Sequence, residues 1–576
     1  MTTTAVSSRA GDRLLVVRSA LRSRHAPLAL LGALMLLALV LLYRKGSGLT
    51  FFYDEWNFVM NRRDWSVSTF LEPHNEHLSL VPVAIYKFLF ATVGIDAYWP
   101  YRVLLLTLHL VCVGLLFLLA RRRVGGVVAV YASLPVLFLG AAWQDLLWAF
   151  QIGYLVSVAA GLGMLLALER RSRGADVLAC ILLAVAVGSS SIGIPFAVAA
   201  FVELVARREP WQRLWIVAAP ALLYALWSLA YGNPRAAPGA QEGLGPLLRQ
   251  NIPDTPVYVA NAAAGAFGAV TGLGLDWGRP LALLAAVGLA VWLASSRPVT
   301  PRALGLLAAA LAYWGLTGLF RAQLNVPAES RYLYFGAVLL VLLAVELFRA
   351  ARLSDRGRTV LVVLVAAAAV ANFGPLQDGS RDLQDTSGHV TAGLGALEAA
   401  GESTDPDFRP DPVRAPDIVA SRYFAAVRDL GSPAATLHEI RARDEPYRQT
   451  ADLVLVQALP VSLLPGWERA PTGNRPPAVD GAPAGRVSTR QGCMTFRPAA
   501  PGSAIDLTVP RSGLVIRPET PAEVRVRQFA SDFPPSALGS VAAGTTTRLR
   551  VPERPQLGPW HARLTPTGPL TVCTLR

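Results

Sequence analysis

The chain has 576 residues, of which 53% are hydrophobic and only 16% charged, and its formal net charge is +14. Ordinary soluble domains carry about 25% charged residues, whereas this chain collects its apolar residues in blocks long enough to cross a bilayer, which excludes a soluble enzyme. Residues 1–373 hold 31 Lys and Arg against 18 Asp and Glu, and 374–576 hold 22 against 21. An excess confined to the apolar half indicates membrane topology signals rather than a nucleic-acid surface.

Apolar runs predict a polytopic helical membrane protein with about eleven transmembrane helices. The first run, about 26–43, follows an arginine-rich arm and ends in Tyr43-Arg44-Lys45 without a small-residue cleavage site. This favours an uncleaved helix with a cytoplasmic N-terminus over a signal peptide. The other predicted spans lie near 98–120, 126–142, 146–168, 177–189, 194–206, 214–231, 281–295, 303–320, 332–348 and 359–373.

Basic clusters fix the expected orientation. The arm 1–25 and the loops near 121–123, 170–173, 207–213, 297–302 and 349–358 fall on one side and hold 20 of the 31 basic residues. This asymmetry satisfies the positive-inside rule. Counting 257–275 as a further span would reverse the pattern, so we expect an interfacial or cavity-lining helix there. Scarce lysine (only Lys45 and Lys87) beside abundant Ala, Gly and Arg suggests a bacterium with a high-GC genome.

After residue 373 the composition becomes polar, and by parity 374–576 is expected to be an extracytoplasmic soluble domain. Residues 413–430 form its best helix candidate. Alternating runs at 452–457, 505–509, 513–517, 523–528 and 546–551 predict strands and a small β-sandwich. Cys112 and Cys180 lie in apolar spans and are expected to be packing residues. Cys493 and Cys573 lie in the exported domain, where we expect a disulfide.

The first outside loop, 44–97, holds the most polar sequence of the membrane half. Its acidic pair Asp54-Glu55 lies among aromatic residues, just beyond the first span. Carboxylates there can abstract a proton from a hydroxyl or hold a divalent cation. The plainer interpretation is that both are solvated, one of them capping a short helix.

His74 and His77 follow in the same loop, in the sequence His-Asn-Glu-His. Three residues apart, they would share a helical face if the loop were helical. The order differs from the H-E-x-x-H motif of zinc proteases. They either shape the loop surface or orient a substrate hydroxyl or phosphate.

Other polar residues are expected on the same side. Asp145 lies in the second outside loop, and Arg331-Tyr332 opens a late span. Arginine at the lipid–water boundary is often a snorkelling anchor, but its planar guanidinium also suits phosphate.

Together these features resemble the GT-C superfamily of integral-membrane glycosyltransferases, which includes protein O-mannosyltransferases, aminoarabinose transferases and arabinofuranosyltransferases. The family places an acidic motif in its first large outside loop, and Asp54-Glu55-Trp56 matches one of the forms of that motif. Arg331-Tyr332 is similar to the arginine-tyrosine pair of relatives that use lipid phosphates. The resemblance covers the architecture of residues 26–373 and only a few motif residues.

The resemblance implies a polyprenyl-phosphate sugar donor and transfer with inversion to an acceptor hydroxyl of a glycan, glycolipid or protein. Asp54 would be the general base, with Glu55 positioning the acceptor or holding a metal, Mg or Mn if any. Arg331, with Arg102 or Arg321, would stabilise the departing phosphate. The remaining candidate substrate-binding residues are His74, Glu76, His77, Asp145 and Tyr332. No nucleotide cofactor is expected, since no nucleotide-binding glycine loop is present. The alternatives are a transporter or flippase of lipid-linked saccharide and a non-catalytic envelope assembly protein.

Overall fold

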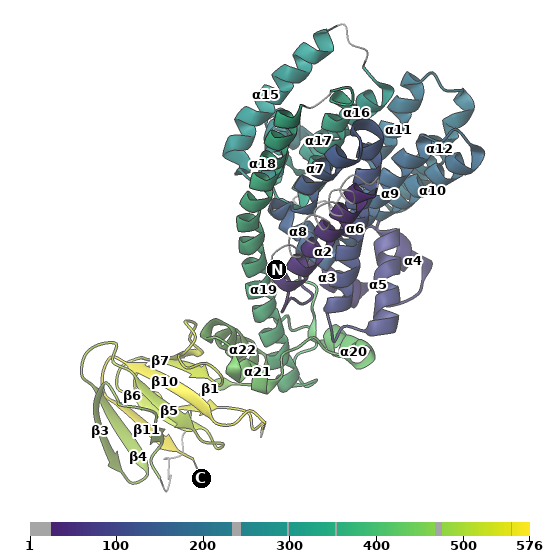
Figure 1. Cartoon of the computed structure of the whole chain (residues 1–576). Helices are drawn as coiled ribbons and strands as arrows, with labels where there is room; N and C mark the ends of the chain where they lie inside the picture. Colours follow the sequence, from purple (N-terminus) through teal and green to yellow (C-terminus); the bar gives the residue numbers. More distant parts are fainter. Residues whose placement is uncertain are drawn as a thin grey trace, which may run out of the picture. The chain divides into compact units, whose positions relative to one another are not determined.

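The computed structural model describes residues 25–575 except 76, 233–243, 296–298, 352–353, 467–474 and 555. The chain divides into two units (Figure 1). The first is helical and comprises Met1–Ser47, Asp64–Leu89 and Trp99–Leu383. The second comprises Gly48–Arg63, Phe90–Tyr98 and Gln384–Arg576. The acidic pair of the first loop therefore belongs to the same unit as the strands.

Long apolar helices make up the first unit. Seven helices in the described part of the chain are long and apolar enough to span a membrane, and up to eight if the bent pair Gly126–Leu137 and Gly140–Leu147 is one span. The other predicted spans lie on shorter helices. The helices of this unit are α2 (Ala26–Lys45), α4 (Val67–Leu71), α5 (Leu80–Val93), α6 (Trp99–Val124), α7 (Gly126–Leu137), α8 (Trp143–Leu147), α9 (Ile152–Leu168), α10 (Arg173–Ser189), α11 (Gly193–Ala206), α12 (Trp215–Tyr231), α13 (Leu244–Asn251), α14 (Thr255–Thr271), α15 (Gly274–Ala294), α16 (Pro301–Arg321), α17 (Ser330–Leu347) and α18 (Asp355–Ala371).

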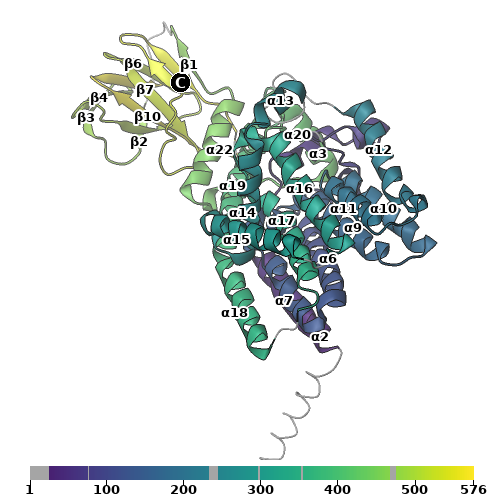
Figure 2. The same ribbon diagram turned by 90° about the horizontal axis from the view of Figure 1, so that it is seen from above.

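Small residues let these helices approach closely. A Cβ on Gly278 of α15 would come within 2.0 Å of the Ala264 carbonyl oxygen of α14. One on Gly305 of α16 would come within 2.6 Å of the Ala199 carbonyl oxygen of α11. Such contacts supply the van der Waals packing on which helix association in lipid depends. Figure 2 shows α9, α10 and α11 side by side, in agreement with their contacts.

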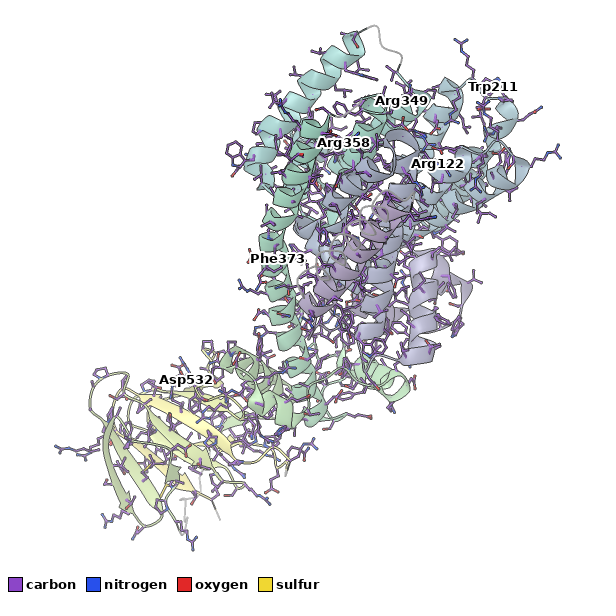
Figure 3. All side chains as sticks on the ribbon, in the orientation of Figure 1. Arg122, Trp211, Arg349, Arg358, Phe373 and Asp532 are labelled. Atoms are coloured by element: carbon purple, nitrogen blue, oxygen red, sulfur yellow. A yellow bond between two sulfur atoms is a disulfide. The ribbon has the colours of Figure 1, made fainter. Side chains whose placement is uncertain are left out.

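One end of the helical unit is rich in arginine, and we call it the basic end. Figure 3 shows Arg122, Arg349 and Arg358 at this end. Phe373, which follows α18, lies away from it. Buried and half-buried carboxylates compensate part of this charge: Arg123 binds Glu346 at 2.5 Å, and Arg302 binds Glu203 at 2.5 Å. The basic clusters predicted from the sequence to share one side therefore do so where the structure describes them.

The segment predicted as an interfacial or cavity-lining helix is α14, which packs against α15, α16 and α17. A 28-residue helix, α19 (Phe373–Ala400), follows α18 and runs past the start predicted for the soluble domain. The helix expected at 413–430 is shorter, α20 (Ala420–Leu430), and α21 (Leu437–Ala442) follows it.

The strand predicted at 452–457 is wrong. These residues belong to α22 (Glu445–Ala458). The run Leu-Val-Leu-Val is β-prone, but Ala451, Val454, Leu455 and Ala458 are buried at helical spacing. A proline at the first turn of α22 pre-organises the helix start.

Two antiparallel sheets form most of the second unit. One has the order β1-β9-β6-β11-β4-β3 and the other β2-β5-β10-β7-β8. Four of the predicted strands are confirmed, as β5, β6, β7 and β9. Buried and half-buried residues alternate along β5, β7 and β10, as expected of strands with one face on a core. The strands are β1 (Ser462–Pro465), β2 (Ala478–Val479), β3 (Gly485–Arg490), β4 (Cys493–Pro498), β5 (Ile505–Val509), β6 (Leu514–Pro518), β7 (Ala522–Arg527), β8 (Gly539–Val541), β9 (Thr547–Arg550), β10 (Trp560–Pro566) and β11 (Leu570–Thr574).

A disulfide joins the two sheet cysteines. Cys493 and Cys573 are directly opposite each other on β4 and β11, and their sulfur atoms are bonded. Cys112 and Cys180 are free thiols. The predicted class, a polytopic helical membrane protein with a mainly β C-terminal domain, is confirmed.

Candidate functional site

The acidic pair opens a short helix in the second unit. Asp54 is the first residue of α3 (Asp54–Asn61) and is partly exposed, whereas Glu55 is completely buried. Tyr53, which precedes them, has φ 50° and ψ −123°. That conformation is unusual for any residue but glycine. The N-terminus of α3 therefore presents one carboxylate outward and one inward.

Glu55 lies among aromatic side chains. The Tyr98 hydroxyl donates to the carboxylate, 3.0 Å from each oxygen, and the Phe52 backbone N–H donates to Oε2 at 3.3 Å. The Tyr98 ring meets Phe51 edge to face at 4.8 Å. Trp56 Nε1 donates to the Phe51 carbonyl at 3.0 Å. These bonds compensate the burial of the carboxylate.

Residues after α19 hold α3 in place. Asn57 and Asn61 donate to Asp417 Oδ1 at 3.2 Å each. The Tyr53 N–H donates to the Arg414 carbonyl at 2.7 Å. The acidic pair is thus supported by residues more than 350 positions later, a link that no local sequence pattern carries.

The two loop histidines do not share a helical face. They belong to the helical unit, and their backbones pair in an antiparallel bridge, with N–H to carbonyl distances of 3.0 Å in both directions. Asn75 between them has φ 53°, which ends any helical path. The His74 ring lies 5.3 Å from that of Phe150. Glu76, the third candidate of this loop, lies outside the described residues.

A second polar cluster joins α8 to the start of α17 in the helical unit. Asp145 is completely buried and neither carboxylate oxygen has a hydrogen-bond partner among the described residues. The positive charge that acts on the Asp145 carboxylate is that of Arg331. Gln144 ties the two elements together: its Oε1 accepts from the Arg331 N–H at 3.2 Å, and its Nε2 donates to Glu329 at 2.9 Å.

Tyrosines extend this cluster. The Tyr313 hydroxyl donates to the Tyr332 carbonyl at 2.8 Å and lies 3.0 Å from the Tyr154 hydroxyl. Asp145, Arg331 and Tyr332, predicted separately, are therefore brought to one place. Gln144, beside Asp145 in the second outside loop, and Tyr313, within a predicted span, were not predicted as site residues, because neither belongs to a distinctive motif.

Arg102 has a different environment. Its buried guanidinium donates to the Leu42 carbonyl at 2.9 Å and to the Tyr43 carbonyl at 3.2 Å. It thus satisfies carbonyls at the C-terminus of α2 and complements the helix dipole. Gly46 leaves room for it, since a Cβ there would overlap the guanidinium.

Lys87 was missed by the sequence analysis. Its ammonium group is buried, bonds to the Asp64 carbonyl, and lies 5.0 Å from the Trp65 ring and 5.1 Å from the Phe70 ring. A Thr69 hydroxyl bond lowers the pKa of the nearby Asp64 carboxyl. The sequence feature that distinguishes Lys87 is its rarity, because it is one of only two lysines among 53 basic residues.

No three His, Cys, Asp or Glu side chains come together to hold a metal ion within the described part of the chain. Asp54 and Glu55 point to different surroundings and do not make a cage of oxygen ligands. In the described part of the chain these two carboxylates therefore do not form a metal site by themselves.

No family model matches the chain, and no curated protein matches it. Among solved structures, the chain is similar to the crystal structure of ArnT from Cupriavidus metallidurans bound to undecaprenyl phosphate. The match covers 67% of this chain and 82% of that one, with 16% sequence identity and a TM-score of 0.43.

Proposed function

We propose that the chain is a membrane glycosyltransferase. It moves a sugar from a polyprenyl-phosphate donor to an acceptor hydroxyl outside the cytoplasm, with inversion, in the synthesis of cell-envelope glycans or glycoconjugates. The observation that carries the proposal is Asp54, a partly exposed carboxylate that opens α3 next to Tyr53, whose φ is positive and whose ψ is −123°. Backbone strain of that kind concentrates at functional sites.

Asp54 is the general base of the proposed reaction. It accepts the proton of the acceptor hydroxyl while the hydroxyl oxygen bonds to the anomeric carbon. The bond from that carbon to the phosphate oxygen breaks, and the lipid phosphate leaves with the electron pair. A single displacement of this kind inverts the anomeric centre and needs no metal ion.

Arg331 stabilises the departing phosphate. Its guanidinium offers several donors in a fixed fork, which matches phosphate oxygens. Gln144 Oε1 accepts the Arg331 backbone N–H at the start of α17, and the Arg331 charge acts on the buried Asp145 carboxylate. His74 and His77 are assigned to the sugar pocket. Arg102 is not assigned this role, because both of its terminal nitrogens donate to α2 carbonyls.

The orientation follows from the basic end, which we place in the cytoplasm. The second unit then lies outside, where nucleotide sugars are absent and a lipid-linked donor is required. The ArnT structure contains undecaprenyl phosphate, a lipid of the proposed class. The assignment itself rests on Asp54 and the membrane helices of this chain.

Transport of a lipid-linked saccharide is the second candidate function. The pair formed by Gly126–Leu137 and Gly140–Leu147 is bent by 42°, and Asp145 lies buried just after the bend. Broken helices and buried charges are features of transporter binding sites. A transporter would move the donor without consuming it.

The test is sugar transfer from a panel of synthetic polyprenyl-phosphate sugars, in membranes that contain wild-type protein or Asp54→Asn. The exposed Asp276→Asn is the matched control, since its carboxylate is 93% exposed on α15. Transfer by the wild type and by the control, and its loss in Asp54→Asn at equal expression, is expected. Equal transfer by all three proteins would refute Asp54 as base. Translocation of the lipid without transfer would instead establish the transporter.

A further inference from the structure

The buried Glu55 carries no route to a substrate. Its side chain is 0% exposed, and both of its oxygens accept the Tyr98 hydroxyl. A general base must reach the proton that it abstracts. The Glu55 carboxylate is instead bonded to the hydroxyl of Tyr98, whose ring packs on Phe51.

The backbone ahead of it is strained. Tyr53 has φ 50° and ψ −123°, far from the left-handed helical well that Asn325 occupies with φ 52° and ψ 35°. Residues held in such regions are destabilising and persist only where their surroundings enforce them. The Tyr53 ring is 45% exposed, so its burial offsets little of that cost.

Several bonds enforce the strained turn. The Phe52 backbone N–H donates a hydrogen bond to Glu55 Oε2, and the Tyr53 N–H donates to the Arg414 carbonyl at 2.7 Å. The Tyr53 carbonyl accepts the Trp56 N–H at 3.1 Å, which starts α3. Asp54 lies between Tyr53 and Glu55 in the chain, so these hydrogen bonds restrain its backbone on both sides.

We propose that Glu55 and Tyr98 form a clamp that holds the strained turn at Tyr53 and so positions Asp54. Glu55 is therefore a positioning residue and neither a base nor a metal ligand. This inference rests on the proposed glycosyltransferase function, in which Asp54 acts on the acceptor hydroxyl. In this proposal Glu55, the second acid of the pair, fixes the position of Asp54, the first.

The first test compares Tyr98→Phe with Glu55→Gln in the transfer assay. Tyr98→Phe removes only the hydroxyl and keeps the ring packing. If the clamp positions Asp54, both variants lower kcat about 10- to 100-fold, the loss typical of a misplacement near 1 Å. The KM for the donor stays unchanged, and the double variant loses no more than the worse single one. A wild-type rate for Tyr98→Phe beside an inactive Glu55→Gln would overturn the proposal.

The second test removes the strain instead of the clamp. Glycine adopts the Tyr53 conformation without a Cβ penalty. In the Tyr98→Phe background, Tyr53→Gly is expected to restore much of the lost kcat, whereas Tyr53→Ala, which also removes the ring but keeps the Cβ, is not. Equal rates for the Gly and Ala double variants would overturn the strained-turn argument.

A measurement without catalysis separates this proposal from the function. Tyr98→Phe should lower the melting temperature of the detergent-purified protein with Glu55 present, and much less in the Glu55→Gln background. Equal shifts in both backgrounds would show that no clamp exists. If the clamp is found but wild-type protein transfers no sugar, the proposed function fails and the positioning of Asp54 has no catalytic role, which overturns the inference as well. If the wild type transfers sugar but the melting-temperature shift of Tyr98→Phe does not depend on Glu55, the inference is overturned and the proposed function stands.

Discussion

Asp452 of α22 allows a quantitative prediction for the second unit. Its side chain is completely buried, and burial raises the pKa of the carboxyl from 3.8 to about 6. Three backbone N–H groups oppose that rise: those of Gln528 and Phe529 donate to Oδ1 at 2.9 and 2.8 Å, and that of Ala530 to Oδ2 at 3.0 Å. The carboxyl links α22 to the segment after β7.

The sign follows from proton linkage. The folded state binds the Asp452 proton more tightly than the unfolded state, so this group's contribution is fully present below pH 3.8 and is lost as pH rises to about 6. A shift of roughly two pKa units corresponds to about 3 kcal/mol. For a unit of this size, that equals about 6–12 °C in melting temperature.

The assay compares thermal unfolding of the detergent-purified wild type and Asp452→Asn from pH 4 to pH 7. The amide keeps the acceptor for Gln528 and Phe529 but turns a donor toward the Ala530 N–H, which costs about 1–3 kcal/mol at all pH values. Because other titrating groups are common to both proteins, the difference isolates Asp452. The wild type should lose about 3 kcal/mol relative to the variant as pH rises. A difference that is constant, or that grows in favour of the wild type, would mean that the hydrogen bonds outweigh burial.

Three further perturbations have expected outcomes. Arg102→Ala should lower the melting temperature by removing charged hydrogen bonds, each of about 1.5–3 kcal/mol, with no change in donor KM; a specific rise in KM would restore its phosphate role. Glu203→Gln should cost about 3–5 kcal/mol by leaving buried Arg302 with too little negative charge, and adding Arg302→Met should recover stability in thermal unfolding; no loss in the single variant would contradict this. Replacing Cys493 and Cys573 by Ala should cost about 2–5 kcal/mol, and reductant should have the same effect on the wild type but none on the variant.

Much of the fold was predictable because its signals are local. An apolar run of sufficient length becomes a helix in lipid whatever surrounds it, and the arginines at its ends record its direction. The alternation in β5 and β7 was equally readable. At 452–457 the same reasoning failed, because a short apolar run has no periodicity of its own and the helical set begins at Ala451.

The candidate site was less predictable, because its geometry depends on distant residues. The burial of Glu55 requires Tyr98, 43 positions later, and Arg102 is committed to carbonyls 59 and 60 positions earlier. The spacing of the two histidines allowed a shared helical face, and the positive φ of Asn75 between them could not be inferred from that spacing. A motif identified Asp54, but only the tertiary structure separates its role from that of its neighbour.

The position of β11 constrains how the protein is made. This strand, Leu570–Thr574, is not at an edge: it pairs with β6 on one side and β4 on the other. The six-stranded sheet cannot close until these residues have left the ribosome. Until then β6 and β4 expose unpaired edges that can pair with other chains. The six-stranded sheet therefore closes only after β11 has been made, and the disulfide between Cys493 and Cys573 then joins β4 to β11.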